Sequence, residues 1–274
     1  MFSRALTVVS LLVCSLWAAQ DAAPPRLTRA QQEEFLRTGK MVAHQRIGKG
    51  VTHSLRATLE KDGFRHDAHF QTIDIVQRTF TTKKRAELNF KDSFKFNIAA
   101  YELAKLLGID DMIPPSVQRG LDGNTGACSW WVDNVLMDEE ARLKKKIDPP
   151  NALGWNHEVQ VTRVFDQLIS NTDRNLGNLL IDKSWRVWMI DHTRAFRPDH
   201  DLLEPGNLTH CDRALLARMR ELKHDVLKEK IGRWVTGMEI DGLLVRRDKI
   251  VALFDKAVKD EGEPAILFDR PRRN

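Results

Sequence analysis

The chain has 274 residues, of which 42% are hydrophobic and 30% are charged, and its formal net charge is +5. This composition is that of a globular protein and excludes collagen, a disulfide-dense miniprotein, a low-complexity chain and a polytopic membrane protein. The 43 basic residues are nearly balanced by 38 acidic ones, so the charge does not itself indicate binding to nucleic acid. A chain of this length forms about two domains or lobes.

Residues 1–23 are predicted to be an export signal. Arg4 supplies a short basic region, and the uncharged residues 5–19 follow it. Ala18 and Ala19 offer the small side chains that a signal peptidase requires. The uncharged stretch is shorter than the roughly 20 residues that span a bilayer. We therefore expect an exported protein, periplasmic or extracellular, with no stable transmembrane segment after cleavage. An uncleaved N-terminal membrane anchor is the alternative.

The residues that follow the signal begin with a β-rich part, predicted to be an N-lobe over residues 24–136. Thr28 and Gln31 form a capping box, which predicts a helix over Arg29–Thr38 that ends at Gly39. Alternating apolar residues and turn signals predict the strands, and a helical apolar pattern ended by Gly108 predicts one more helix. The strands are expected over 41–47, 52–60, 66–76, 116–121 and 127–135, and the helix over 94–107.

The remaining part, residues 137–274, is predicted to be a mainly helical C-lobe. Helices are expected over 137–147 and 155–170, and again from about residue 212 onward. Two short strands, 179–182 and 186–190, lie between them. Strands followed by helices indicate an α+β chain with two lobes.

The segment 170–196 carries the most chemical information. Asp173 lies at the end of a predicted helix, Asn178 follows five residues later, and Asp191 comes 13 positions after Asn178. Phosphoryl transfer requires a carboxylate for the acceptor's proton and oxygen ligands that hold magnesium against the nucleotide phosphates. Asp173 is suited to the first role, and Asn178 and Asp191, as hard oxygen donors, to the second. Arg174 is the other predicted catalytic-loop residue, expected to hold the loop by ion pairing.

This spacing resembles the catalytic loop and metal segment of the protein-kinase-like fold. The stretches NTDRNLGN (171–178) and IDHTRAF (190–196) look most like those of the type II phosphatidylinositol 4-kinases, which read NTDRxxxN and IDNGxAF. HipA-type kinases and the secretory-pathway kinases of the Golgi belong to the same broad structural group. The resemblance implies a two-lobed protein-kinase-like fold that binds ATP and Mg²⁺ between a β-rich N-lobe and a mainly helical C-lobe.

The N-lobe is expected to supply the nucleotide cradle. Gly48, Lys49 and Gly50 lie between the first two predicted strands, where backbone N–H groups can approach phosphate. Glu102 is in the helix where kinases place the Glu that pairs with a strand Lys. Gln71 stands where that Lys usually is, and a neutral amide cannot neutralise a phosphate. The candidates for a compensating cation are Lys49, Lys83, Lys84, Lys91 and Lys95.

These features predict an exported atypical kinase that transfers a phosphoryl group from ATP to a protein, lipid or sugar acceptor. The departures at Gln71 and at His192-Thr193, which follow the metal Asp, leave two alternatives open. One is a catalytically weak or inactive binding module on the kinase fold, a pseudokinase. The other is a nucleotidyl transferase on the same fold.

A lysine run and a pair of cysteines each allow more than one interpretation. The run Lys144–Lys146 is suited to an anionic substrate, although such runs are more often solvated helix faces. After signal removal Cys128 and Cys211 remain, and in an oxidising compartment two cysteines can pair. Their separation in the fold decides whether they do.

Overall fold

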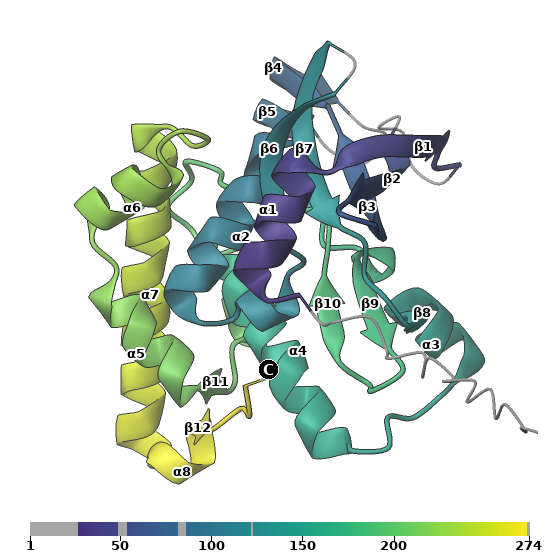
Figure 1. The fold of residues 1–274 in the computed structure, drawn as a ribbon. Coiled ribbons are helices and arrows are strands. Elements are labelled where there is room, and N and C mark those ends of the chain that lie inside the picture. Colours follow the sequence, from purple (N-terminus) through teal and green to yellow (C-terminus); the bar gives the residue numbers. More distant parts are fainter. Residues whose placement is uncertain (1–26, 49–53, 82–85, 122, 273–274) are drawn as a thin grey trace, which may run out of the picture.

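The computed structural model describes residues 27–48, 54–81, 86–121 and 123–272, so the predicted signal at 1–23 lies outside the described residues (Figure 1). Its first part is a five-stranded sheet in which every neighbouring pair is antiparallel, with helix α1 (Arg29–Thr38) packed against it. The Thr28–Gln31 capping box that the sequence predicts opens this helix. In order across the sheet, the strands are β1 (Lys40–Arg46), β2 (Leu55–Lys61), β3 (Phe64–Gln71), β7 (Asn124–Trp130) and β6 (Ser116–Leu121).

Strand β3 has one face in a core and the other toward the second half of the molecule. Ala68 and Phe70 are buried in a hydrophobic cluster that also contains Phe35 of α1. Because successive side chains of a strand point to opposite faces, His69 and Gln71 lie on the other face. That face therefore supplies the β3 side chains that approach the segment 170–196.

Between β3 and helix α2 (Lys95–Leu107) the chain forms a separate antiparallel hairpin of β4 (Asp74–Thr81) and β5 (Ala86–Ser93). The prediction of one continuous strand over 66–76 is wrong, because β3 ends at Gln71 and β4 starts at Asp74. The Phe94 N–H donates to the Ile73 carbonyl at 2.7 Å and closes the base of the hairpin. Both strands share the two-residue period, so the pattern alone could not reveal the change of sheet.

Helix α2 joins the sheet to the helical part. It contacts β6 and β7 on one side and the later helices α5 (Arg213–Glu221) and α6 (His224–Ile231) on the other (Figure 1). Most of its buried side chains, among them Tyr101, belong to the main hydrophobic core of the second part. Gly108 ends the helix as predicted, with a left-handed φ of 68° that favours glycine.

The second part is mainly helical, with a small three-stranded sheet ordered β10-β9-β8 beside the helices (Figure 1). The helix predicted over 137–147 begins later than expected, because strand β8 occupies its first two residues and α3 starts at Glu139. Asp138 caps this helix, and its carboxylate accepts from the Ala141 N–H at 2.8 Å. The elements are β8 (Val135–Asp138), α3 (Glu139–Lys145), α4 (Ala152–Leu168), the 3-10 turn η2 (Leu176–Asn178), β9 (Leu179–Asp182), β10 (Val187–Met189), β11 (Cys211–Asp212), α7 (Gly237–Glu261), α8 (Glu263–Ile266) and β12 (Leu267–Phe268), with 3-10 turns at Asp110–Met112 and Pro205–Asn207.

The two cysteines of the described residues are free and buried in different hydrophobic clusters. Cys128 lies in β7 and Cys211 in β11, so no disulfide joins them. Burial raises the pKa of the Cys128 thiol to about 12. In the described parts of the chain, no helix combines the length and the apolar character needed to cross a membrane.

Candidate active site

The loop that carries Asp173 follows α4 directly and is held by backbone and side-chain hydrogen bonds. The Asn171 N–H donates to the Asp166 carbonyl at 2.9 Å, and the Asn171 side-chain oxygen accepts from the Asp173 N–H at 3.2 Å. The Asp173 side chain remains 45% exposed, with an Arg194 nitrogen 3.8 Å from its carboxylate. A carboxylate that is partly exposed on a fixed loop can be reached by an acceptor hydroxyl.

Arg174 ties this loop to the segment that carries Asp191. Its guanidinium bonds both carboxylate oxygens of Asp166, at 2.9 and 3.1 Å. It also donates to the backbone carbonyls of Asn178, at 3.0 Å, and of Ile190, at 2.7 Å. Because a guanidinium presents its donors in a rigid planar fork, one side chain fixes three segments at once. The predicted role of Arg174, holding the loop by ion pairing, agrees with these contacts.

Asn178 and Asp191 lie on neighbouring backbone segments, and each side chain keeps an oxygen that could bind a divalent metal ion. The Ile190 N–H donates to the Asn178 carbonyl at 3.0 Å. The Asn178 amide nitrogen donates to the Asp173 carbonyl at 3.4 Å, which leaves its amide oxygen as an acceptor. The Thr193 hydroxyl uses one Asp191 carboxylate oxygen, at 3.1 Å, and the second oxygen remains. Asp191 has a left-handed φ of 54°, which is uncommon for a residue other than glycine.

In nucleotide sites magnesium is usually held by one or two protein carboxylates, and substrate phosphates and water complete its shell. Throughout the described ranges, no three His, Cys, Asp or Glu side chains gather into a cluster that could hold a metal alone. Asn178 and Asp191 would therefore hold the ion together with a nucleotide.

Gln71 is linked to the metal segment through a residue that the sequence analysis did not single out. The Asn97 amide nitrogen donates to the Gln71 side-chain oxygen at 2.8 Å, and the Asn97 oxygen accepts from the His192 N–H at 2.7 Å. Gln71 is 2% exposed and Asn97 is 6% exposed. Strand β3, helix α2 and the residue after Asp191 are thus connected by a chain of uncharged hydrogen bonds. A polar Asn inside the apolar pattern of α2 was the available signal.

Glu102 lies away from this chain of contacts. It pairs with Lys105 of its own helix at 2.8 Å, and Lys105 also reaches Glu33 of α1 at 3.1 Å. The α2 residue that faces β3 is Asn97, about one and a half turns earlier in the helix. Of the predicted glycine-rich turn, Gly48 is exposed just beyond β1, whereas Lys49 and Gly50 lie outside the described residues.

The cation beside the candidate base is Arg194, which the sequence analysis did not propose. Its Nε donates to the buried Asp92 carboxylate at 3.0 Å and lies 3.8 Å from Asp173. The guanidinium also stacks over Phe80 and Phe90 of the β4–β5 hairpin, 5.7 and 5.0 Å from their ring centres. Arg194 therefore joins the hairpin to the catalytic loop.

Two of the proposed compensating lysines are engaged with carboxylates. Lys91 pairs with Glu239 of α7, and Lys95 pairs with Asp74 at 2.7 Å. The other three candidates, Lys49, Lys83 and Lys84, lie outside the described residues.

Two histidines lie close to Asp191. Burial lowers the pKa of His192 well below its usual value, and the neighbouring Arg174 charge acts in the same direction. Burial also lowers the pKa of His69, although the Asp191 charge opposes that shift. Both rings are therefore neutral at pH 7, and neither replaces the missing strand cation there.

The neutral link between β3 and α2 gives a testable expectation. Gln71→Lys introduces an ammonium group at a buried position whose partner is an amide, so we expect a loss of about 2–4 kcal/mol in unfolding free energy. Adding Asn97→Glu supplies a carboxylate and should restore most of that loss. Urea unfolding of the two variants and the wild type measures both effects. A single variant as stable as the wild type would contradict the buried, uncharged character of this contact.

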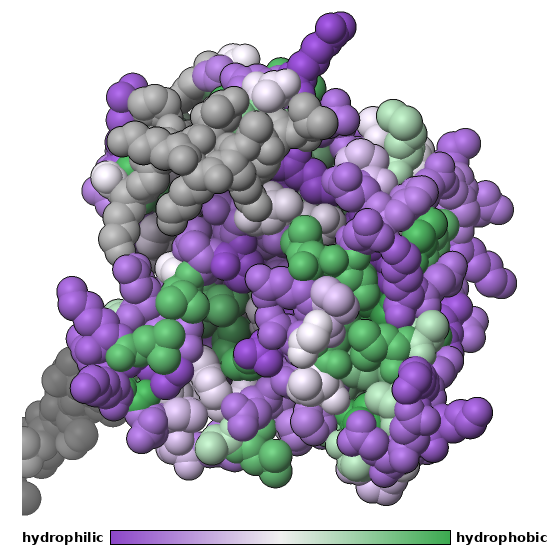
Figure 2. Space-filling view, turned by 180° about the vertical axis from the view of Figure 1, so that it is seen from behind, coloured by the Kyte–Doolittle hydropathy of each residue, from purple (hydrophilic) through white to green (hydrophobic). Residues whose placement is uncertain are grey.

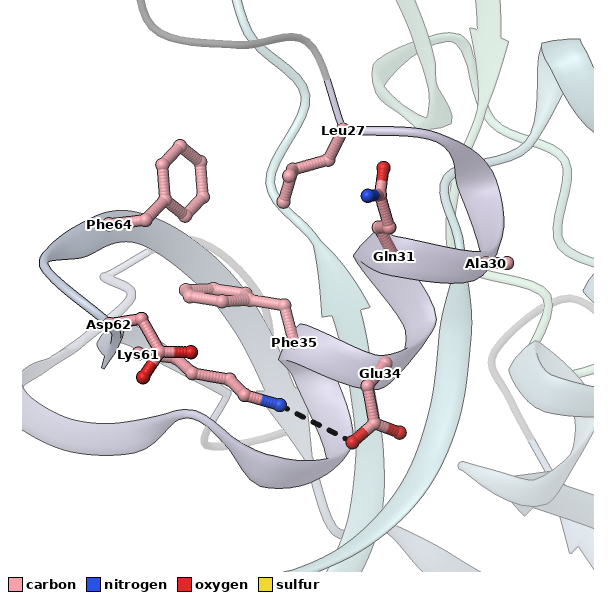
Figure 3. Close-up of a pocket in the computed structure, with 8 residues that line it drawn as sticks. All are labelled: Leu27, Ala30, Gln31, Glu34, Phe35, Lys61, Asp62 and Phe64. Atoms are coloured by element: carbon pink, nitrogen blue, oxygen red, sulfur yellow. Dashed lines mark hydrogen bonds and ion pairs between the residues drawn. The ribbon is translucent and has the colours of Figure 1, made fainter.

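A cavity of about 430 Å³ lies outside this site, between α1 and the turn that joins β2 to β3 (Figure 3). Leu27, Phe35 and Phe64 supply its apolar walls, and Lys61 pairs with Glu34 across it at 3.3 Å. It is on the α1 side of the sheet, opposite to the face that carries Gln71.

No family model matches the chain, and no curated protein matches it either. Solved structures resemble it through their fold. The Fam20 protein of hydra, whose structure was solved with sugar, has a TM-score of 0.67 at 14% identity, over 88% of this chain and 92% of that one. The Golgi casein kinase has a TM-score of 0.61 at 13% identity, over 89% of this chain and 80% of its own.

A second structure of the Golgi casein kinase, with Mn/ADP bound, gives a TM-score of 0.60 at 13% identity over the same shares, 89% and 80%. At such low identity the likeness concerns the fold and not the chemistry, which depends on the residues of the site. The chain therefore has an atypical kinase-like fold, with a β-rich first part and a helical second part, of the kind found in the hydra Fam20 protein and the Golgi casein kinase.

Proposed function

We propose that this protein is an atypical kinase that transfers the γ-phosphoryl group of ATP to a hydroxyl of an acceptor. The observation that carries the proposal is the bonding of Arg174 to Asp166 and to the carbonyls of Asn178 and Ile190. Arg174 directly follows Asp173 in the chain, and its guanidinium bonds the backbone of Asn178 and of Ile190, the residue before Asp191. The kinase-like fold supports the same conclusion independently.

The oxygen of the acceptor hydroxyl bonds to the γ-phosphorus of ATP, and Asp173 takes the proton of that hydroxyl. At the same time the bond between the γ-phosphorus and the bridging oxygen breaks, and this oxygen leaves with ADP. Asn178 and Asp191 would hold the divalent metal, which supplies charge neutralisation at the phosphates. Gly48, Lys49 and Gly50 would cradle the phosphates through their backbone N–H groups. We propose magnesium as the metal. The structure of the Golgi casein kinase, which has a similar fold, was solved with Mn/ADP bound.

Two further parts of the proposal concern origin and location. The NTDR and IDHTRAF stretches favour a relationship with the type II phosphatidylinositol 4-kinases and HipA-type kinases within the wider group. The predicted signal over 1–23 favours export, with the acceptor encountered outside the cytoplasm.

Magnesium-dependent nucleotide binding tests the proposal. We expect ATP with Mg²⁺ to raise the melting temperature of the wild type, since a ligand that binds only the folded state stabilises it. Asp191→Ala should remove that increase, whereas Asp248→Ala, at an exposed position of α7, should keep it. Equal shifts in both variants would exclude Asp191 as a metal ligand, and no shift in the wild type would count against an ATP-dependent enzyme.

A pseudokinase remains the second candidate because of one observation. The place of the usual strand Lys is occupied by Gln71, which bonds to the neutral Asn97. A protein that binds ATP with Mg²⁺ but yields no phosphorylated product would be this second candidate. Mass spectrometry of any product separates an added phosphate from an added nucleotide.

A further inference from the structure

The hydropathy of the surface does not single out a ligand site. On the face seen in Figure 2 the hydrophobic residues form several separate patches, with hydrophilic residues between them. Phosphate is a polar ligand, and proteins recognise it through hydrogen-bond donors and cations rather than through apolar area. A phosphate site is therefore better indicated by donors that the protein itself leaves unused.

Arg194 leaves most of its hydrogen-bond donors unused beside the candidate base. Its Nε donates to the Asp92 carboxylate at 3.0 Å and lies 3.8 Å from the Asp173 carboxylate. A guanidinium has five N–H donors, and four of them belong to its two Nη atoms. Among the described residues, neither Nη atom has an acceptor. The side chain is 22% exposed, so a ligand can reach these donors.

The position of Arg194 is fixed by contacts on its side chain and on its backbone. The guanidinium lies over the rings of Phe80 and Phe90, 5.7 and 5.0 Å from their centres. The N–H and the hydroxyl of Thr172 both donate to the Arg194 carbonyl at 3.2 Å. A side chain that is already held loses little conformational freedom when it binds a ligand, which favours affinity.

Three other cations that were considered for this site are committed to partners within the protein. Arg174 bonds the Asp166 carboxylate and two backbone carbonyls. Lys91 and Lys95 each pair with a carboxylate. Arg194 differs from Arg174 because both of its Nη atoms are uncommitted.

The geometry of phosphoryl transfer brings the γ-phosphate close to these donors. A general base lies about 2.6–3.2 Å from the hydroxyl oxygen that it deprotonates, and reacting atoms approach each other to about 3–3.5 Å. The γ-phosphorus would therefore come within about 7 Å of the Asp173 carboxylate, on which Arg194 also borders.

The chemistry of a guanidinium suits the group that is transferred. The charge of that group is spread over three oxygens, and the planar fork of a guanidinium can bond two oxygens at once. The buried Asp92 carboxylate balances the charge of Arg194. Arg194 therefore offers directed donors rather than surplus positive charge.

We propose that Arg194 binds the γ-phosphate of ATP and stabilises the charge on that group during its transfer. The Nη atoms donate to the non-bridging oxygens, while Asp92 and the two phenylalanine rings hold the guanidinium. The phosphate contact then comes from the segment after Asp191 and not from β3, where Gln71 bonds to a neutral amide. This inference rests on the proposed kinase function and adds a phosphate-binding residue to it.

Isothermal titration calorimetry with two nucleotides tests the proposal without phosphoryl transfer. The ligands are ADP and the non-hydrolysable ATP analogue AMP-PNP, each titrated with Mg²⁺ into the full chain. AMP-PNP carries a γ-phosphate and ADP does not, so the ratio of their affinities measures contacts to that group. Partial loss of folded protein would lower the fitted number of sites and leave the ratio unchanged.

The variants are chosen so that Asp92 is not left buried without its partner. Asp92→Asn keeps the guanidinium, and adding Arg194→Gln removes it and leaves no unpaired carboxylate. We expect the double variant to bind AMP-PNP about tenfold or more weakly than Asp92→Asn does, with ADP affinities within about twofold of each other. Arg65→Gln, at an exposed pair with Glu60, should bind both nucleotides as the wild type does.

Equal losses of ADP and AMP-PNP affinity in the double variant would overturn the proposal, because Arg194 would then act on the nucleotide site as a whole. Unchanged affinities would overturn it as well. In both cases the wild type still binds nucleotide, so the proposed kinase function would stand. A wild type that binds neither nucleotide would count against the kinase function itself, and the phosphate contact would fall with it.

Discussion

We expect Asp173→Asn to lower the rate of the proposed phosphoryl transfer by about 10²–10⁴-fold, the contribution that a positioned general base makes. An amide of the same shape cannot take the acceptor's proton. The Asp173 side chain is 45% exposed, and the contacts of Asn171 and Arg174, which hold the loop, are unchanged in this variant. Nucleotide binding and the melting temperature should therefore remain close to those of the wild type. The measurement is transfer of labelled phosphate from ATP, to the protein itself or to a peptide acceptor.

The matched control for this variant is Asp201→Asn, an exposed carboxylate that pairs with Lys249 at 2.7 Å on the surface. It should transfer phosphate at the wild-type rate. If Asp173→Asn were as active as this control, the proton would have another destination and Asp173 would not be the base. If the wild type were inactive as well while binding ATP, the pseudokinase would be the better description.

Arg174→Met has the largest expected effect on stability. The variant leaves the Asp166 carboxylate, whose side chain is 10% exposed, without its ion pair. Breaking a buried pair by removing one partner costs about 3–5 kcal/mol. For a chain of this size each kcal/mol lowers the melting temperature by about 2–4 °C, so a decrease of about 10 °C is expected. The carbonyls of Asn178 and Ile190 also lose the hydrogen bond from Arg174, although the Asn178 carbonyl keeps the Ile190 N–H, and the ATP shift should weaken.

A surface ion pair provides the comparison. Arg65→Met removes a pair with Glu60 in which the Arg side chain is 67% exposed, and such pairs contribute about 0–1 kcal/mol. Adding Asp166→Leu to Arg174→Met removes the unpaired charge and should recover part of the lost stability. An Arg174→Met protein that melts like Arg65→Met would show that Arg174 does not hold the loop.

The contacts within the segment 170–196 could be predicted from the sequence better than those of its surroundings. Asp173, Asn178 and Asp191 are close in sequence and separated by one short hairpin, so their spacing alone indicates that they meet. Arg174 could be assigned to the loop for the same reason. Its partner Asp166 could not, because nothing in a helix pattern distinguishes a buried Asp that faces a loop from one that faces water.

Contacts between distant segments were the part that the sequence did not reveal. Arg194 meets Asp92 across 102 positions, and Asn97 meets His192 across 95. These contacts depend on the point at which β3 ends and the separate β4–β5 hairpin begins. The alternation of apolar and polar residues continues across that point and does not indicate it. The place of Glu102 in the middle of a helix predicts a contact with β3, yet its side chain pairs with Lys105 of the same helix. Rotation about the helix axis depends on packing, which a pattern of residue types gives only approximately.

The uncharged contact between Gln71 and Asn97 has a consequence for ionic strength. Salt screens interactions between charges, with a Debye length of about 8 Å at 0.15 M, and it acts weakly on hydrogen bonds between amides. The link from β3 through α2 to the metal segment should therefore be insensitive to added salt. The partly exposed pair of Arg194 and Asp173 is charged and should loosen as salt increases. Added salt should therefore weaken the Arg194–Asp173 pair and leave the Gln71–Asn97 contact unchanged. Varying the ionic strength would then distinguish the contributions of these two contacts.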